Sequence, residues 1–293
     1  MSLTELVSII LVNYNGADVL VDCLKSLDKF IPKNEYEIIL VDNNSQDNSI
    51  DIINREFANI KLIRLLENVG FGAGNNIGAK AATGEFLFLL NTDTILTNNI
   101  LPHLIKLMSA NSDIGIVGPK LLFPDGSFQI SFSPEIGIKG ESESRKMHKN
   151  SQDENYVNTI ERDFKNIRQV DIVVGAAFFI RRDLFNLLNG FDEEFFMYFE
   201  ESDLCQRVRD KGYKILYTPH SSLIHIRGHS VKKTSNKMVV EYRRSQIYYY
   251  HKHRPTWEIL ILKIYLLFKF SCEYLQTINA CNLEIIKLVF TYK

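Results

Sequence analysis

The stretch that decides the fold is Val7-Ser-Ile-Ile-Leu-Val-Asn-Tyr-Asn-Gly16, and a segment with helical spacing, from Ala17 to Phe30, follows it directly. The run from Val7 to Val12 is almost continuously apolar and rich in β-branched side chains, which is typical of a strand buried on both faces. The helical segment would gather its apolar side chains on one face: Val19, Leu20, Cys23, Leu24 and Leu27. A buried strand that passes through a polar turn into an amphipathic helix predicts the opening unit of an α/β fold.

Strands and helices continue to alternate through the first half of the chain. This alternation predicts a mainly parallel sheet with helices on both faces. In such a sheet, right-handed crossovers leave the ligand site outside the carboxyl ends of the strands. Further strands are expected at 37–41, 60–65, 85–90 and 114–122, and helices from Ser45 or Asp47 to residue 57, at 71–82 and at 98–110.

Polar residues follow three of these strands at the point where each strand ends. The clusters are Asn13-Tyr-Asn-Gly16, Asp42-Asn-Asn-Ser45 and Asn91-Thr-Asp93. One such cluster would be an ordinary turn, because Asn and Asp favour turns. Three clusters at the same edge of one sheet predict a shared binding crevice.

The segment Phe191-Asp-Glu-Glu-Phe-Phe-Met-Tyr-Phe-Glu-Glu-Ser-Asp203 mixes carboxylates with aromatic and thioether side chains. A carboxylate held against apolar rings loses solvation, so its pKa moves. General bases and metal sites are built in this way. The other interpretation is an amphipathic stretch with its rings inward and its acids in water, and both stand at this point.

The rest of the second half is less regular. Residues 133–168 are rich in charges, Ser and Asn, which predicts a long mobile loop or lid. The apolar run 170–180 predicts a strand that is interrupted at Gly175, where the backbone can approach a ligand closely. Short strands are expected at 213–217 and 222–226, and a helix from residue 236 onward.

Two neighbouring segments near the C-terminal end differ in character. The stretch from Arg227 to Arg254 holds eight Lys or Arg and one acid, Glu241. The stretch from Trp257 to Phe270 is strongly apolar, and about 14 residues are too few to span a bilayer. These segments fit either a solvated helix face next to a core helix, or an interfacial helix that contacts an anionic lipid surface.

Composition narrows the classes of function. A net charge of −1 over 293 residues gives no general case for nucleic-acid binding. The four cysteines are scattered without a C-x-x-C pair, so neither a zinc knuckle nor a thiol redox motif is indicated, and a reducing, cytoplasmic compartment is favoured. No signal peptide is expected, because the first apolar run, from Leu6 to Val12, is short and lacks a basic leader.

Six segments together carry more information than any one of them, because their order and spacing are quite specific. They are Val12-Asn-Tyr-Asn-Gly16, Val41-Asp-Asn-Asn-Ser45, Glu67-Asn-Val-Gly-Phe-Gly-Ala-Gly-Asn-Asn-Ile-Gly78, Leu90-Asn-Thr-Asp93, Gly190-Phe-Asp-Glu-Glu-Phe-Phe-Met-Tyr-Phe-Glu-Glu-Ser-Asp-Leu204 and His225-Ile-Arg-Gly-His-Ser230. This set resembles the inverting glycosyltransferases of the GT-A fold (glycosyltransferase family 2). The branch it resembles most is that of bacterial rhamnosyltransferases acting on cell-surface polysaccharide.

The resemblance covers roughly residues 5–250 and implies how the chain is organised. A GT-A domain would occupy residues 1–235, with a mainly parallel sheet that binds a nucleotide-diphospho-sugar. Residues 1–125 would hold the donor, and residues 126–235 the acceptor and the catalytic groups. A helical extension would follow at 236–293, packed as core or in contact with a membrane.

The resemblance also assigns donor-binding residues. Tyr14 would pack on the nucleotide base, and Asp42 would accept the hydrogen bond of the pyrimidine imide N–H. Asn44 and Asn75 would lie nearby, although many family members carry Arg at the position of Asn75. The glycine at 175 is the place where backbone would approach the ligand.

A divalent metal, Mg²⁺ or Mn²⁺, is the cofactor that the resemblance implies. Asn91-Thr92-Asp93 matches the D-x-D position, whose final Asp binds a metal that bridges the diphosphate. Here Asn91 replaces the first Asp, so metal affinity without nucleotide should be weak. His225 matches a histidine that can join the metal, and imidazole suits Mn²⁺ better than Mg²⁺. A core histidine between two strands is the other interpretation of His225.

The acidic segment matches the family's Glu-Asp motif, whose second residue is the general base. That residue is Glu201 here, a Glu where Asp is usual, and Glu200 is the second candidate. Asp203 is expected to make a structural bond to Arg207 one helical turn away. Asp192 is expected to cap a turn.

The function that follows is an inverting transfer of a sugar to a cell-surface polysaccharide or a lipid-linked glycan. The donor expected first is dTDP-rhamnose, with UDP-hexose and UDP-galactofuranose as alternatives. A catalytically inactive homologue that binds a nucleotide as a scaffold is a second class of function. The enzyme is expected in the cytoplasm, with peripheral contact to the inner face of the membrane, a polyprenyl-diphosphate-linked acceptor and no nucleic acid.

Overall fold

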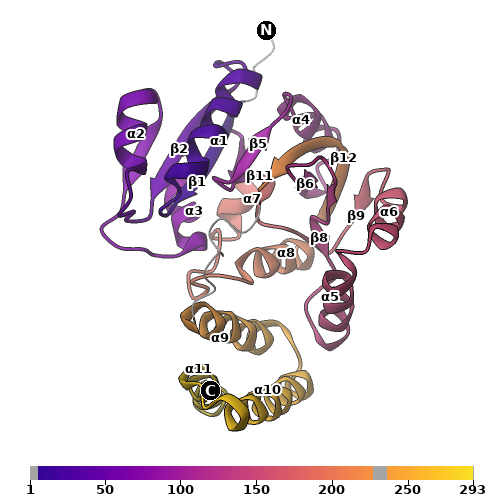
Figure 1. Ribbon diagram of the computed structural model, residues 1–293. Coiled ribbons are helices and arrows are strands. Elements are labelled where there is room, and N and C mark those ends of the chain that lie inside the picture. The colour runs from indigo at the N-terminus through magenta and orange to yellow at the C-terminus, as the bar shows by residue number, and fades with distance from the viewer. Residues whose placement is uncertain (1–5, 227–235, 293) are drawn as a thin grey trace.

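A computed structural model describes residues 6–226 and 236–292, and it contains a central mixed sheet covered by helices (Figure 1). Within these residues, ten strands form one sheet, in the order β3-β2-β1-β4-β11-β6-β12-β5, with β7 on β6 and β9 on β12. The first strands are β1 (Val7–Asn13), β2 (Tyr36–Asp42), β3 (Lys61–Arg64), β4 (Phe86–Leu90), β5 (Thr94–Leu96) and β6 (Ile114–Leu122). The later ones are β7 (Phe128–Gln129), β8 (Phe132–Ser133), β9 (Arg168–Gln169), β10 (Ile172–Val173), β11 (Ala177–Arg181) and β12 (Lys214–His225).

The half of the sheet nearest the N-terminus is parallel, as the alternation predicts. β1 pairs in parallel with β2 and with β4, and β2 pairs in parallel with β3. The crossovers between them are α1 (Ala17–Phe30), α2 (Ser49–Glu56) and α3 (Phe71–Lys80). Because Asn13 and Asp42 are register partners, the polar residues that follow β1 and β2 emerge side by side.

The other half of the sheet is mixed, so the prediction of a mainly parallel sheet is wrong there. β11 runs antiparallel to both β4 and β6, whereas β12 is parallel to β6. β11 follows β10 after only residues 174–176, so no helix directly precedes it as one precedes β2, β3 and β4. The two short strands expected at 213–217 and 222–226 form one strand, β12, with an irregular register between Thr218 and Ser222.

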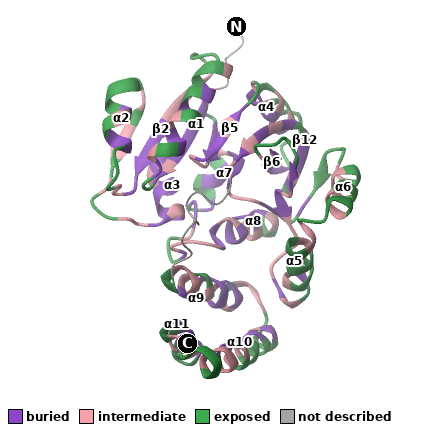
Figure 2. Ribbon diagram, viewed as in Figure 1, coloured by how far each residue is buried: buried purple, intermediate pink, exposed green. Residues whose placement is uncertain are grey.

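The prediction of a long loop at 133–168 is also wrong. Two helices, α5 (Ile138–Asn150) and α6 (Glu154–Asp163), occupy most of it. Asp153 caps α6 by accepting hydrogen bonds from the backbone N–H groups of Asn155 and Tyr156. These helices are mostly exposed (Figure 2). α5 is polar around most of each turn, and α6 packs only a short apolar face, Val157 and Ile160, against the core.

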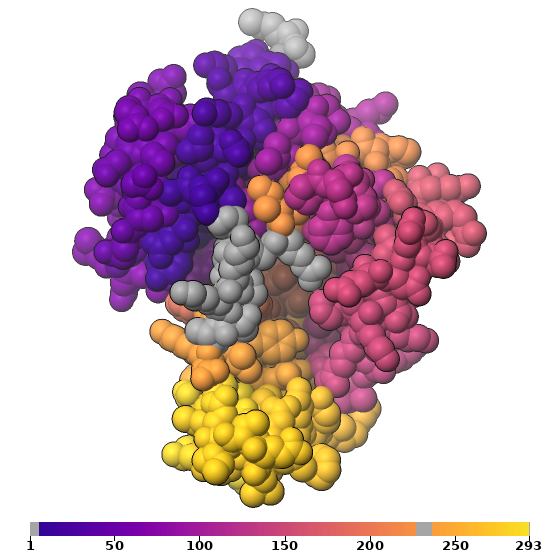
Figure 3. Space-filling model, in the orientation of Figure 1, coloured from indigo at the N-terminus to yellow at the C-terminus, as the bar shows by residue number. Residues whose placement is uncertain are grey.

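The remaining helices place the acidic segment between the sheet and the C-terminal helices (Figure 1). α8 (Glu200–Asp210) packs under the sheet, and α9 (Asn236–His253) lies on the side of α8 that faces away from the sheet. Figure 3 shows α9 to α11 as an orange and yellow lobe at one end of the molecule. The helices not yet named are α4 (Leu101–Ala110), α7 (Arg182–Leu187), α10 (Thr256–Thr277) and α11 (Ala280–Thr291).

The helical lobe has its own apolar core, formed by side chains of α9, α10 and α11 with Phe195 and Phe199. Arg254 ties the lobe to the segment before α5, because it pairs with Glu135 (2.5 Å) and with Glu258 (2.8 Å). Residues 227–235, which include part of the basic stretch and the predicted domain boundary at 235, lie outside the described residues. In the part of the chain that is described, no helix is both long enough and apolar enough to cross a membrane.

Candidate active site

A cleft opens at the carboxyl ends of the parallel strands, where three polar clusters were predicted to meet. Tyr14 and Gly16 line it after β1, Asn43 lines it after β2, and Asn91 and Asp93 line it after β4. Tyr14 is half exposed, at 51%, so its ring is free to stack on a flat ligand. The predicted crevice is therefore present at the sheet edge that the polar clusters indicated.

Asp42 lies beneath the wall of this cleft. It is almost fully buried, and its carboxylate accepts hydrogen bonds from the Asn13 side chain (3.1 Å) and from the Ser45 backbone N–H (3.2 Å). The neighbouring Asn43 was not predicted as a site residue. Its amide bridges the cleft to the loop before α3, donating to the Gly70 carbonyl (3.0 Å) and accepting from the Val69 N–H (2.9 Å).

Two predicted donor-binding residues are not part of the cleft wall. Asn75 is buried in α3, and its side chain donates to the carbonyl of Phe71 one turn earlier (3.0 Å). Asn44 adopts a left-handed conformation (φ 62°) and accepts a hydrogen bond from Gln46 (3.2 Å). Both asparagines thus satisfy local backbone and side-chain groups, which a motif comparison does not reveal.

Asp93 and His225 face each other across the sheet, although they are far apart in the sequence. β12 pairs with β5 so that His225 is opposite Thr94, the residue after Asp93. The Asp93 Oδ1 and His225 Nε2 atoms lie 3.4 Å apart, and both side chains are nearly buried. Asn91 is held close by, because its backbone N–H donates to the Ala176 carbonyl (2.9 Å).

Gln129 fixes the imidazole of His225, and sequence reasoning missed it. Its Nε2 donates to the His225 backbone carbonyl (3.3 Å), which leaves its Oε1 to accept from His225 Nδ1 (2.7 Å). This assignment from hydrogen bonds puts the proton on Nδ1 and directs the Nε2 lone pair toward Asp93. A short strand, β7, carries Gln129, and no sequence pattern marked that strand.

The donor atoms here fit part of a divalent-metal shell. Within the described residues, no group of three or more His, Cys, Asp or Glu side chains is placed to hold a metal ion. One carboxylate oxygen and one imidazole nitrogen do converge, and Mg²⁺ or Mn²⁺ commonly completes such a set with phosphate oxygens and water. Asp93 and His225 therefore fit a metal that arrives with a diphosphate.

The acidic segment enters α8 through an unusual backbone turn. Tyr198 and Phe199 both have a φ of 69°, a region that bulky residues rarely adopt. Such strain is found at functional sites when the surrounding structure enforces it. Here it directs Glu200 and Glu201, the first residues of the helix, under the sheet, with Glu201 next to Gly175 and Glu200 next to Gly72.

Glu200 and Glu201 are a buried pair of carboxyls. Burial raises the pKa of both, and the charge of Glu201 raises the pKa of Glu200 further. The Gly175 backbone N–H partly offsets this effect at Glu201. Among the residues described, the Oε2 atom of each has no hydrogen-bond partner. A carboxyl with a raised pKa and a free oxygen is suited to take a proton from a hydroxyl.

Asp203 lies on the same helix in the opposite environment. Arg207 donates to its Oδ2 (2.8 Å), as predicted, and His253 Nε2 and Lys252 Nζ each lie 2.7 Å from its Oδ1. Burial alone would raise its pKa, but these three partners lower the pKa to about 2. Lys252 also pairs with Asp192 (2.5 Å), which caps the turn at Glu194 as predicted.

Gly70 brings the acidic segment against the donor half of the chain. Its φ is +89°, and any side chain there would clash with the carbonyl of Phe196. That carbonyl accepts a hydrogen bond from the Phe71 N–H (3.2 Å). Phe196 and Met197 consequently line the same cleft as Tyr14.

Comparisons with known proteins agree with this architecture. The chain is 24% identical over 277 residues to an N-acetylglucosaminyl-diphospho-decaprenol L-rhamnosyltransferase from Mycobacterium tuberculosis, and the match covers 87% of each chain. Its fold is similar to that of a mannosyltransferase from Pyrobaculum calidifontis solved with GDP-mannose and Mn²⁺ (TM-score 0.58, 16% identity, covering 97% of this chain and 72% of that one).

A further solved structure shares the fold, namely TarS from S. aureus in complex with UDP. The TM-score is 0.53 at 18% identity, and the similarity covers 83% of this chain and 64% of the other. Residues 8–188 match the family described as glycosyl transferase family 2, and this span contains the donor cleft, Asp93 and Gly175. The chain therefore belongs to glycosyl transferase family 2.

Proposed function

We propose that this protein is an inverting glycosyltransferase that moves a sugar, with rhamnose from dTDP-rhamnose as the first candidate, to a cell-surface polysaccharide or lipid-linked glycan. The observation that carries the proposal is that the short segment 174–176 contacts both the candidate base and the D-x-D position. On one side of it the Gly175 backbone meets Glu201, and next to it Ala176 bonds to Asn91 of the D-x-D position. The closeness of Glu201 to the strand that ends just before Asn91 supports a proton acceptor next to a diphosphate site.

The donor would bind across the cleft. Tyr14 would stack on the nucleotide base. Asp42, which is buried behind the cleft wall, would accept the hydrogen bond of the imide N–H after Asn13 or Ser45 moves slightly away from it. The backbone at Asn44 lies next to this wall, whereas Asn75 would act only through the helix it stabilises. Asn91 and Asp93 would lie at the diphosphate, where their oxygens and amide contact phosphate or its bound metal.

Asp93 and His225 would hold the divalent metal. When bound, Mg²⁺ or Mn²⁺ supplies positive charge that stabilises the departing diphosphate. Gln129 keeps the lone pair of His225 directed toward that position. The Mn²⁺ in the related mannosyltransferase structure supports this choice of cofactor.

Glu201 would act as the general base. Its free carboxylate oxygen would accept the proton of an acceptor hydroxyl while the oxygen of that hydroxyl attacks the anomeric carbon. The bond between the anomeric carbon and the diphosphate breaks on the opposite face of the sugar. The configuration at the anomeric carbon is inverted in one displacement. Glu200, whose pKa is raised by burial and by the charge of Glu201, is the second candidate for this role.

The donor and acceptor in this proposal are supported by the Mycobacterium tuberculosis relative, whose name specifies rhamnose and a polyprenyl-diphosphate-linked sugar. The test is release of nucleotide from a panel of dTDP-rhamnose, UDP-hexoses and UDP-galactofuranose, with Mg²⁺, Mn²⁺ or a chelator. Metal-dependent release from one donor is expected. Absence of release, together with absence of nucleotide binding by calorimetry, would favour the inactive scaffold and contradict the enzyme.

The exposed face of α10 supports peripheral contact with the inner face of the membrane. Four large apolar residues on this face are each more than half exposed: Trp257 (57%), Leu260 (59%), Ile264 (57%) and Phe268 (72%). The opposite face carries Leu262, Leu266 and Phe270, which are buried in the lobe. An exposed apolar stripe on a helix whose opposite face is buried in the lobe fits an interfacial position.

A flotation assay with anionic vesicles tests this contact. The full chain is expected to float with the vesicles, and a variant with Ile264→Glu and Phe268→Glu is expected to remain behind. Leu66→Glu is the matched control, because Leu66 is 97% exposed in the other half of the chain. If the double variant floats as well as the control, the α10 face does not bind the membrane.

A further inference from the structure

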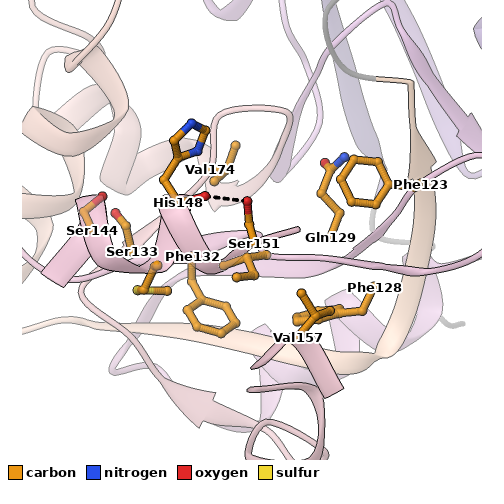
Figure 4. Close-up of a pocket in the computed structure, with 12 residues that line it drawn as sticks. Phe123, Phe128, Gln129, Phe132, Ser133, Ser144, His148, Ser151, Val157 and Val174 are labelled. Atoms are coloured by element: carbon orange, nitrogen blue, oxygen red, sulfur yellow. Dashed lines mark hydrogen bonds between the residues drawn. The ribbon is translucent and has the colours of Figure 1, made fainter. Parts of the chain in front are cut away.

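A second cavity, of about 160 Å³ (Figure 4), shares none of the residues that line the donor cleft. Phe128 of β7 and Phe132 of β8 form part of its wall. Ser144 and His148 reach it from α5, and Val157 reaches it from α6. It is therefore built by the two helices that the sequence did not predict.

The cavity borders both functional groups of the active site. Val174 is part of its wall, Gly175 meets Glu201, and Ala176 bonds to Asn91. Consecutive Cα atoms are about 3.8 Å apart, so these three residues span about 7 Å. On the other side, Gln129 lines the cavity and also bonds to His225. A molecule in the cavity would thus extend toward the base and the metal position.

The lining chemistry indicates the class of ligand. Phenylalanine rings provide apolar surface, while the hydroxyls of Ser133, Ser144 and Ser151 and the imidazole of His148 provide polar contacts near them. Apolar walls with a few convergent polar groups are typical of small-ligand sites. Drug-sized ligands occupy about 300–1,000 Å³, so this cavity takes a fragment the size of one sugar ring. A polyprenyl chain would need a longer and wholly apolar groove.

We propose that this cavity binds a sugar ring of the acceptor glycan and thereby places the attacking hydroxyl at Glu201. The inference rests on the proposed glycosyltransferase function and adds to it a site for the acceptor. The partly exposed side chains of Phe123, Met147 and Val174 contact the apolar face of the sugar. Ser144, Ser151 and His148 hydrogen-bond its hydroxyl or acetamido groups.

The test fills the cavity without touching the donor cleft. Ser144→Trp places a large ring in the cavity from α5, and Ser142→Trp makes the same change on an exposed position of the same helix. The probe is N-acetylglucosamine diphosphate linked to a short alkyl chain. Ser144→Trp is expected to raise the KM for this probe about tenfold or more, because a lost sugar contact costs that much. Donor hydrolysis in Ser144→Trp, and all constants in Ser142→Trp, should stay within about twofold.

An unchanged KM in Ser144→Trp, with a normally folded protein, would overturn the proposal. A penalty that appears only with long alkyl chains would also overturn it, because the cavity would then take lipid. Ser144→Leu is the second variant if the tryptophan prevents folding. Failure of the wild type to hydrolyse any donor would instead contradict the proposed function. In that case, saturation-transfer NMR with free N-acetylglucosamine still decides whether the cavity binds sugar, since Ser144→Trp should abolish the signal.

Discussion

The two sides of α8 place carboxyls in opposite environments. Glu201 faces Gly175 and the sheet with one oxygen unpaired, and burial raises its pKa. Asp203, on the side toward α9, is even more deeply buried, yet its pKa falls to about 2 because three cationic or hydrogen-bonding groups surround it. Partners, and not burial alone, therefore separate a group that exchanges protons from one that holds the structure together.

This contrast gives each side of α8 a different task. In the proposed function the side toward the sheet supplies the general base, whereas the side toward α9 joins the GT-A fold to the helical lobe through Lys252 and His253. The division of the chain at residue 235 stays a prediction. If the contrast is correct, substitutions on the two sides should affect different measurements.

The largest effect is expected from Glu201→Gln. Loss of the general base should lower turnover by about 10²- to 10⁴-fold, with donor affinity unchanged. Steady-state kinetics and calorimetry with the nucleotide measure the two quantities. Glu194→Gln, at an exposed position of the same segment, is the control and should retain activity. Unchanged turnover in Glu201→Gln, or a larger loss in Glu200→Gln, would remove Glu201 from the role of base.

Asp203→Asn should affect stability first. It would leave Arg207, Lys252 and His253 without their buried counter-charge, and breaking such a network costs about 3–5 kcal/mol. Chemical denaturation of the full chain measures the loss. Asp210→Asn on the exposed end of α8 is the matched control and should be nearly neutral. A loss of activity without a loss of stability would show that Asp203 belongs to the chemistry.

Gln129→Leu should weaken metal binding. A partner that orients a metal-binding histidine is typically worth about 10- to 100-fold in affinity. Calorimetry of Mn²⁺ in the presence of nucleotide measures this change, and ¹⁵N NMR of the imidazole reports whether Nδ1 loses its fixed proton. Gln152→Leu, at an exposed position, is the control. Equal Mn²⁺ affinity in the two variants would contradict the role given to Gln129.

The pH dependence should separate activity from stability. The pKa of Glu201 is raised above its usual 4.5, so activity should fall with decreasing pH while the pH is still above that value. The pKa of Asp203 is lowered from 3.8 to about 2, so its contribution is complete above about pH 4 and is lost as the pH falls toward 2. That contribution is about 2 kcal/mol. Near pH 4.5 the protein should be folded and largely inactive, and coincident loss of both properties would contradict this separation.

Sequence reasoning predicted the parallel half of the fold, because each element there has a clear period. The helix at Ala17–Phe30 has the bounds that the apolar spacing predicted. The clusters after β1, β2 and β4 meet at one cleft, as the rule for parallel sheets requires. Within this half, the single motif residues Asn44 and Asn75 were placed less well, because local hydrogen bonds determine where their side chains lie.

The second half was less predictable for physical reasons. Helix α5 is polar around most of each turn, and the apolar face of α6 is short, so their many charges and polar side chains dominate the sequence of this segment. Gln129 acts through a pairing between β6 and β7 that spans only two residues, which is too short to give a strand pattern. Arg207 could be predicted as a partner of Asp203 from its place one turn away, but His253 lies 50 residues away on α9, and only the folded chain brings it and Lys252 to Asp203.

The most direct test of the account is the configuration of the sugar that is released first when the wild-type enzyme hydrolyses its donor. Proton NMR during the first minutes distinguishes the two anomers before they interconvert. A single displacement assisted by Glu201 predicts that the initial sugar has the anomeric configuration opposite to that of the donor. Initial release with the same configuration would contradict the account. Retention would require a covalent intermediate or another mechanism in which Glu201 does more than accept a proton.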